Sequence, residues 1–276
     1  MKLSNLTQLE MMTNPLLKIC NLNVGYTQTS GWFSKRTIEA VRDVSLEIST
    51  GEIVGIVGES GCGKSTLARA ILRLITPHSG QIEFLGKPLL LLDKPALRDI
   101  RRSIQMVFQD PLSSLDPRMS VGRIIAEPLY QFYPDLSSRQ RHNKVHEIIR
   151  QVELPINVIN RYPHQLSGGQ CQRVNIARAL ISKPELLICD EAVSALDVSV
   201  QAQILNLLRT LTIDSKMSLL FISHDLRVIR QLCNCVLVMY EGQVIESAIC
   251  DDLFDNPQHE YTRKLIASVP SSLNIS

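Results

Sequence analysis

One short glycine-rich stretch decides the fold of this chain: Gly58-Glu59-Ser60-Gly61-Cys62-Gly63-Lys64-Ser65-Thr66. It follows an apolar run, Ile53 to Val57, that is typical of a strand buried on both faces of a parallel sheet. It precedes a helical pattern in which Leu67 and Ile71 share one face. Glycines let several backbone N–H groups turn toward one phosphate, and the helix adds its positive N-terminal end. We therefore predict a phosphate-binding loop in which Lys64 reaches the β- and γ-phosphates and Ser65 binds Mg²⁺.

Two adjacent acids support this interpretation. Asp190 and Glu191 follow a second apolar run, Leu186 to Cys189. A buried strand that delivers a carboxylate to its C-terminal edge can hold Mg²⁺, directly or through water, which is the role we expect for Asp190. Glu191 can then polarise the attacking water as a general base. The alternative is two solvated acids in a loop, which the preceding buried strand disfavours.

A second candidate helix end suggests how many chains the site needs. Leu166-Ser167-Gly168-Gly169-Gln170 precedes a helical stretch, Val174 to Ile181, and so forms another N-terminus suited to phosphate. Taken alone, the pentapeptide could be a simple helix cap. One nucleotide cannot need two complete anion-binding helix ends from one chain. We therefore predict that a second copy supplies the other end and that the nucleotide is sandwiched between subunits.

The remaining pattern predicts an α/β architecture. Apolar runs, including Leu219 to Ser223, alternate with helical patterns, which indicates a mainly parallel sheet. Apolar and polar residues alternate from Leu17 to Ile48, as in antiparallel strands with one solvent-exposed face. Within this stretch we expect a loop over Thr27 to Arg36. Residues from Pro111 to Tyr162 read as helices without a buried strand. They predict an inserted helical subdomain.

Composition excludes several classes of protein. The chain has 276 residues, 45% hydrophobic and 20% charged, with a net charge of +2 that argues for neither nucleic acid nor an anionic membrane. No apolar run approaches the roughly 18–20 residues that cross a bilayer, and Met1 to Glu10 lacks a secretory pattern. The seven scattered cysteines form no CxxC pair and read as reduced structural thiols. Any link to a membrane is expected to go through other proteins.

At this point the sequence resembles the ATP-binding-cassette (ABC) ATPases over nearly its whole length. The motifs follow the family's order: the Walker A loop Gly58 to Ser65, the Q-loop Gln109, the signature motif Leu166 to Gln170, the Walker B strand Leu187 to Asp190, the D-loop Ser194 to Asp197 and the switch histidine His224. The resemblance implies a RecA-like P-loop NTPase core with an N-terminal antiparallel β subdomain and an inserted α-helical subdomain. The expected single domain covers 15–270, with 15–110 and 167–245 as core, 111–166 as helical subdomain and 246–276 as a short C-terminal extension.

The resemblance also assigns roles to individual residues. It implies that ATP and Mg²⁺ are bound, with catalysis by Lys64, Gln109, Glu191 and His224 and Mg²⁺ held by Ser65, Gln109 and Asp190. Tyr26 would stack on adenine, with Trp32 and Phe33 as rivals in the same loop. The residues expected to contact ATP across the dimer are Ser167, Gly168, Gly169, Gln170 and Asp197. Two departures from the family, Ala192 after Glu191 and Cys171 after Gln170, carry no chemistry and leave hydrolysis in place.

The finer resemblance is to ATPase subunits of peptide and nickel importers. Matching phrases include Ile104 to Pro117, Ser194 to Leu208 and His259 to Pro270. The end at Ser276, without a cysteine-rich tail, and the Asp190 to Ser194 segment favour the nickel or metallophore branch slightly. The implied partners are two membrane permeases, a second identical or paralogous ATPase subunit and an extracytoplasmic binding protein, with no nucleic acid. The implied location is the cytoplasmic face of the inner membrane. The alternatives are an exporter subunit and a soluble ABC ATPase without a transport role.

Overall fold

A mainly parallel sheet forms the centre of the molecule. The structure, a computed structural model, describes residues 14–30 and 34–268. The strand order is β10-β9-β3-β8-β7-β6, and every neighbouring pair except β10 and β9 runs parallel. The bounds are β3 (Ile53–Val57), β6 (Ile104–Val107), β7 (Leu186–Asp190), β8 (Ser218–Ile222), β9 (Cys235–Tyr240) and β10 (Gln243–Ile249). The predicted parallel core is confirmed.

A second, antiparallel sheet has the strand order β2-β1-β4-β5. Its bounds are β1 (Leu17–Ser30), β2 (Ser34–Ile48), β4 (Ser79–Phe84) and β5 (Lys87–Pro88). The prediction of a loop over Thr27 to Arg36 is wrong. The backbone pairs Tyr26 with Ile38 and continues to Ser30 with Ser34, so the hairpin stays in register across most of that stretch. Threonine favours strands, and continued pairing with the opposite strand outweighs the polar composition.

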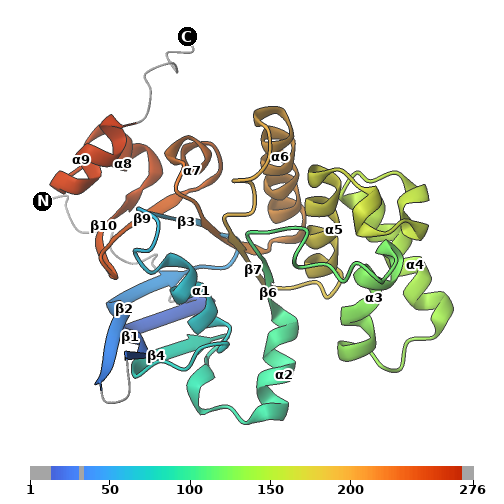
Figure 1. Ribbon diagram of the computed structural model, residues 1–276, viewed down its shortest axis with the longest axis horizontal. Coiled ribbons are helices and arrows are strands. Elements are labelled where there is room, and N and C mark those ends of the chain that lie inside the picture. Colours follow the sequence, from blue (N-terminus) through green and yellow to red (C-terminus); the bar gives the residue numbers. More distant parts are fainter. Residues whose placement is uncertain (1–13, 31–33, 269–276) are drawn as a thin grey trace, which may run out of the picture.

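Helices fill the space around both sheets. The chain between β6 and β7 contributes α3 (Val121–Phe132), α4 (Ser138–Gln151), η2 (Ile156–Asn160), η3 (Pro163–Gln165) and α5 (Gly168–Leu180). Figure 1 shows α3, α4 and α5 grouped on one side, away from β1, β2 and β4. The helical insertion that the sequence predicts, over 111–166, contains α3, α4, η2 and η3, whereas α5 begins beyond its predicted end. The other helices are α1 (Lys64–Ile71), η1 (Leu89–Leu91), α2 (Lys94–Ser103), α6 (Val198–Ser215), α7 (Leu226–Leu232), α8 (Cys250–Asp255) and α9 (Glu260–Ala267).

Each parallel strand is buried on both faces. In β3, Ile53 and Val57 join the core that includes the helical insertion, whereas Val54 and Ile56 join the core shared with the antiparallel sheet. Successive side chains of a strand point to opposite faces, which explains why these runs are continuously apolar. Double burial holds the carboxyl ends of β3, β7 and β8 at one edge of the sheet. Within 14–30 and 34–268, no helix has the length and apolar character to span a bilayer.

Candidate functional site at the carboxyl edge of the parallel sheet

The loop between β3 and α1 needs glycine where other strands come close. Gly58 has φ 153° and Gly63 has φ 108°, both in the region that favours glycine. A Cβ at Gly58 would lie 2.1 Å from the carbonyl oxygen of Met239, and one at Gly63 would lie 2.1 Å from that of Ala40. Any side chain at either position would push the loop away from β9 and β2. The glycines therefore let the loop curl tightly against the core.

Lys64, the first residue of α1, turns back into this loop. Its Nζ donates to the carbonyl oxygens of Gly58 and Glu59, each at 2.8 Å, and lies 3.7 Å from the Cys62 Sγ. The side chain is buried, and among the described residues no salt bridge neutralises it. A cation held by neutral carbonyls in a turn of backbone N–H groups is a site for an anion.

Ser65 and Asp190 meet at the mouth of the loop. The Ser65 hydroxyl donates to Asp190 Oδ1 at 2.9 Å, and Asp190 is only 3% exposed. Burial raises the pKa of Asp190, and the Ser65 hydrogen bond opposes this shift while the Glu191 charge adds to it. Hydroxyl and carboxylate oxygens are the hard donors that Mg²⁺ prefers. The described residues hold no group of three His, Cys, Asp or Glu that could bind a metal alone, so such an ion would take other ligands from water or phosphate.

Two loops converge on the carboxylate of Glu191. Gln109, after β6, donates from Nε2 to Glu191 Oε2 at 2.7 Å. His224, after β8, places Nδ1 3.3 Å from Glu191 Oε1. The Glu191 backbone has φ 48° and donates its N–H to the carbonyl oxygen of Ile222 at 3.0 Å, which fixes the turn after β7. Glu191 is therefore held at the edge of the sheet with both carboxylate oxygens oriented.

Tyr26 lies beside the same loop. Its hydroxyl is 3.1 Å from the Thr66 Oγ1, and its side chain is 40% exposed. An exposed aromatic ring next to a phosphate-binding helix end can stack on a base. The rivals Trp32 and Phe33 lie outside the described residues.

The second predicted helix end is built differently. Ser167 caps α5: its Oγ accepts from the Gln170 N–H at 3.3 Å, and Gln170 Oε1 accepts from the Ser167 N–H at 3.1 Å. Asp197 caps α6 by accepting from the Val200 N–H at 2.9 Å. The contacts described above thus link the phosphate loop with Tyr26 and Asp190, and link Glu191 with Gln109 and His224. The helix α5, which Ser167 caps, lies on the other side of β6 and β7 from α1 (Figure 1).

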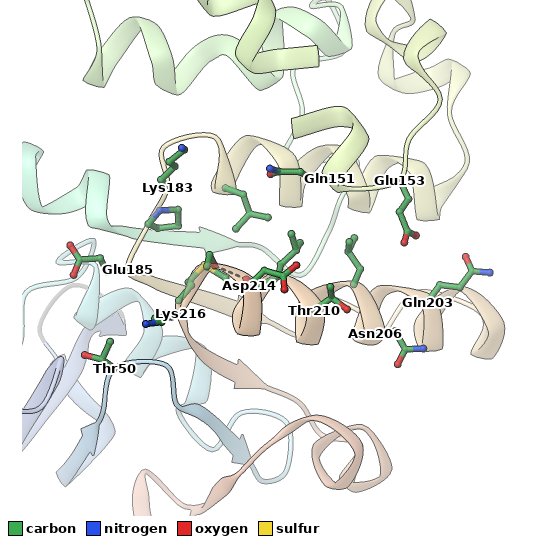
Figure 2. Close-up of a pocket in the computed structure, with 16 residues that line it drawn as sticks. Thr50, Gln151, Glu153, Lys183, Glu185, Gln203, Asn206, Thr210, Asp214 and Lys216 are labelled. Atoms are coloured by element: carbon green, nitrogen blue, oxygen red, sulfur yellow. Dashed lines mark hydrogen bonds between the residues drawn. The ribbon is translucent and has the colours of Figure 1, made fainter. Parts of the chain in front are cut away.

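A separate hollow of about 740 Å³ lies at the opposite edge of the sheet (Figure 2). Thr50, Glu185 and Lys216, which precede β3, β7 and β8, are among its lining residues. None of the predicted site residues lines it. Ligands of open α/β sheets bind outside the carboxyl ends of the strands, so the candidate site is the edge that carries the phosphate loop.

One contact to the loop was missed by the sequence analysis. Tyr261, in α9, accepts a hydrogen bond from the backbone N–H of Glu59 at 3.1 Å. About two hundred residues separate the partners, and neither strand nor helix patterns indicate which distant tyrosine reaches a loop. No signal in the single sequence identifies this contact.

Comparisons with known proteins define the class. The family model described as ABC transporter matches residues 41–194, more than half of the chain, and the chain belongs to this family. Two relatives are the oligopeptide transport ATP-binding proteins OppF of Salmonella typhimurium and Escherichia coli, each 49% identical over 92% of this chain and 78% of the relative. A probable peptide ABC transporter ATP-binding protein of Sinorhizobium fredii, y4tS, is 50% identical over 94% of this chain and 74% of the relative. The names of these three relatives refer to oligopeptide or peptide transport, and none refers to nickel.

Solved structures agree in fold. The ATP-binding cassette MJ0796, in a dimeric post-hydrolysis state bound to ADP and Pi, matches with a TM-score of 0.77 and 31% identity over 85% of this chain and 98% of that chain. The cbiO1 protein of Clostridium perfringens, part of the ABC transporter complex cbiONQ, matches with a TM-score of 0.76 and 28% identity over 93% of this chain and 96% of that chain. The predicted α/β fold, with its antiparallel sheet and helical insertion, is confirmed.

Proposed function

We propose that this chain is the ATP-binding and ATP-hydrolysing subunit of an ABC importer for oligopeptides. The observation that carries the proposal is the Glu191 carboxylate, held between Gln109 and His224 beside the phosphate loop. Membership of the ABC family and 49% identity to two OppF proteins support oligopeptides as the cargo. A structural role for these residues would not require two separate loops to orient one carboxylate.

The phosphate loop binds the nucleotide. Backbone N–H groups from Ser60 to Thr66 surround the phosphates, and Lys64 exchanges its bonds to the Gly58 and Glu59 carbonyls for bonds to β- and γ-phosphate oxygens. Tyr26 stacks on adenine, which contributes about 1–3 kcal/mol. The loop thus supplies charge complementarity and Tyr26 supplies base affinity.

The oxygen donors of Ser65, Asp190 and Gln109 fit Mg²⁺. The Ser65 hydroxyl and the Asp190 carboxylate are already 2.9 Å apart, and burial keeps competing water away from Asp190. When bound, Mg²⁺ neutralises charge that develops on the phosphate oxygens. Gln109 contributes its amide oxygen from the loop after β6.

Glu191 and His224 carry the proton chemistry. Glu191 accepts the proton of the attacking water, and the Gln109 amide orients its carboxylate. His224 bonds the γ-phosphate from Nε2 while Nδ1 faces Glu191.

The site is completed by a second ATPase subunit, identical or paralogous. Across the dimer, the helix end of α5 presents Ser167, Gly168, Gly169 and Gln170 to the γ-phosphate, and Asp197 contacts the facing nucleotide. The capped Ser167 hydroxyl accepts within its own helix and keeps its proton to donate to a phosphate oxygen. The dimeric post-hydrolysis state of MJ0796, bound to ADP and Pi, supports this arrangement.

The remaining partners are two permease subunits and an extracytoplasmic binding protein. A cavity of about 360 Å³ lies beside the segment that carries Gln109, and Leu74, Phe108 and Phe132 are among its lining residues. Leu74 is 52% exposed, which suits an apolar permease segment. With these partners, the chain works at the cytoplasmic face of the inner membrane. Its net charge of +2 is too small to argue for binding to nucleic acid.

Reconstitution with the permeases and binding protein in liposomes tests the proposal. We expect oligopeptides to stimulate ATP hydrolysis and uptake, and nickel to have no effect. In Gln109→Ala, ATP binding should persist while the stimulated rate falls more than the basal rate of the isolated subunit. Hydrolysis without stimulation by any peptide would favour a soluble ATPase, and peptide export would favour an exporter; either result overturns the proposal.

A further inference from the structure

Lys64 and Tyr261, a residue of the C-terminal helix α9, form hydrogen bonds to opposite sides of one peptide group in the phosphate loop. The carbonyl oxygen of Gly58 accepts from Lys64 Nζ at 2.8 Å, and the N–H of the same peptide group, on Glu59, donates to Tyr261 Oη at 3.1 Å. The C=O and N–H of a planar trans peptide point in opposite directions. The two bonds together therefore fix the orientation of this peptide plane.

The orientation of this peptide needs fixing because Gly58 is its first residue. Glycine populates backbone conformations that other residues avoid, so a plane beside it can rotate at little steric cost. When phosphates bind, Lys64 gives up its bond to the Gly58 carbonyl, and the Tyr261 bond is then the one that remains. Tyr261 thus keeps the peptide in place during the exchange.

Tyr261 is itself anchored from several sides. The carboxylate of Glu246, in β10, accepts from the N–H of Gln258 at 2.7 Å and of His259 at 2.9 Å, which fixes the turn before α9. His259 caps α9 by accepting from the Tyr261 N–H at 3.1 Å. The Tyr240 ring packs against the Tyr261 ring with centroids 4.4 Å apart. These contacts hold the hydroxyl at a defined point beside the loop.

Neighbouring backbone contacts brace other parts of the loop. The N–H of Gly242 donates to the carbonyl oxygen of Cys62 at 3.0 Å, and Met239 abuts Gly58. Both residues belong to the β9–β10 hairpin or its turn. Neither contact involves the N–H of the Gly58–Glu59 peptide. The Tyr261 hydroxyl therefore orients a peptide group that the hairpin does not bond.

We infer that Tyr261 is a positioning residue for the phosphates of ATP, acting through the Gly58–Glu59 peptide. The inference rests on the proposed ATP-binding function. It makes α9 a structural part of the nucleotide site, although α9 lies far from the phosphate loop in sequence.

The test compares two conservative variants of the full chain, Tyr261→Phe and Tyr240→Phe. Each loses one hydroxyl from the same ring pair, and only Tyr261 has its hydroxyl bonded to the loop. We expect Tyr261→Phe to raise the Kd of the purified subunit for ATP and for ADP about 3–10-fold, the size of one hydrogen bond. Rates at saturating ATP in the assembled transporter should stay within about twofold of the unmodified chain. Tyr240→Phe should match the unmodified chain in every respect.

Thermal unfolding without nucleotide separates positioning from packing. Both variants should unfold at the same temperature as the unmodified chain, and Tyr261→Phe should gain less stability from added ATP. If Tyr261→Phe binds ATP and ADP as the unmodified chain does, or loses rate at saturation with unchanged affinity, the positioning role is overturned. Equal losses of affinity in both variants would also overturn it, because packing would explain them. If the unmodified chain binds no ATP, the proposed function falls as well.

Discussion

Two glycine-rich helix ends of this molecule look alike in sequence and differ in structure. At the start of α1, Gly63 provides no side-chain cap, and the buried Lys64 ammonium sits inside the loop. At the start of α5, Ser167 and Gln170 form a capping box in which each side chain accepts from the backbone N–H of the other residue. Unsatisfied N–H groups beside a buried cation need an anion, whereas a self-capped end is stable without one. These differences support the proposal that the α1 end binds the phosphates first and that the α5 end contacts a nucleotide held by a second subunit.

The surroundings of the two helix ends also differ: acidic residues lie near the α1 end, and apolar side chains lie near the α5 end. Asp190 and Glu191 both stand at the carboxyl edge of the sheet, close to the α1 end. The α5 end contacts neighbouring apolar side chains, since Gly169 abuts Val200. The acidic residues, including the proposed general base Glu191, therefore lie near only one of the two helix ends of each subunit. In the proposed function, a complete reaction site combines the α1 end of one subunit with the α5 end of another.

The largest effect should come from Lys64→Ala. Removal of the ammonium leaves the phosphate charge uncompensated in the loop, so we expect ATP binding or hydrolysis to be abolished. Equilibrium binding and hydrolysis in the reconstituted complex measure this effect. Near-normal activity would show that the α1 end is not the primary phosphate site.

Ser167→Ala has a matched control in Ser137→Ala. Ser137 caps α4 with the same box that Ser167 forms at α5, so both variants should lose about 0.5–2 kcal/mol of stability. Only Ser167→Ala should slow hydrolysis, by about ten- to hundredfold, the size of a hydrogen bond to a charged group. ATP binding to the isolated subunit should be unchanged in both. A loss of binding in isolated Ser167→Ala would mean that the α5 end acts within its own chain.

The smallest effect concerns the self-capped end of α6. The Val200 N–H, with the Ser199 hydroxyl, lowers the pKa of Asp197 below its usual range. A lowered folded-state pKa gives stability that is present at neutral pH and lost as the pH falls through that value. Asp197→Asn keeps a good cap without a titrating group, so its melting temperature should fall less steeply toward acid pH. Parallel melting curves from neutral to acid pH measure this difference, and identical pH profiles would exclude a contribution from the Asp197 carboxylate.

Residues whose role depends on local spacing were predictable from the sequence. The run Ile53 to Val57 gave β3 with the same bounds, because double burial leaves a continuous apolar run. The loop predicted over Thr27 to Arg36 failed because pairing with a distant strand outweighs local polarity. The Tyr261 contact to Glu59 could not be predicted, since it joins α9 to the phosphate loop only through tertiary packing. Glu191 was predicted as a general base from the buried strand before it, whereas Gln109 and His224 entered through the family resemblance. Their contacts with the Glu191 carboxylate came from the structure.

The most direct test of the two-ended site is the assembly of Glu191→Gln. The amide keeps the shape of the carboxylate and loses the base, so this variant should bind ATP and hydrolyse it slowly, with rates reduced by about 10²–10⁴-fold. Size-exclusion chromatography with light scattering then measures its mass with and without ATP and Mg²⁺, alone and mixed with the companion ATPase subunit. The account predicts a shift from monomer to dimer on addition of ATP and Mg²⁺, and loss of that shift when Ser167→Ala is added. An unchanged monomer mass at every protein concentration, in both settings, would contradict a nucleotide shared between two subunits.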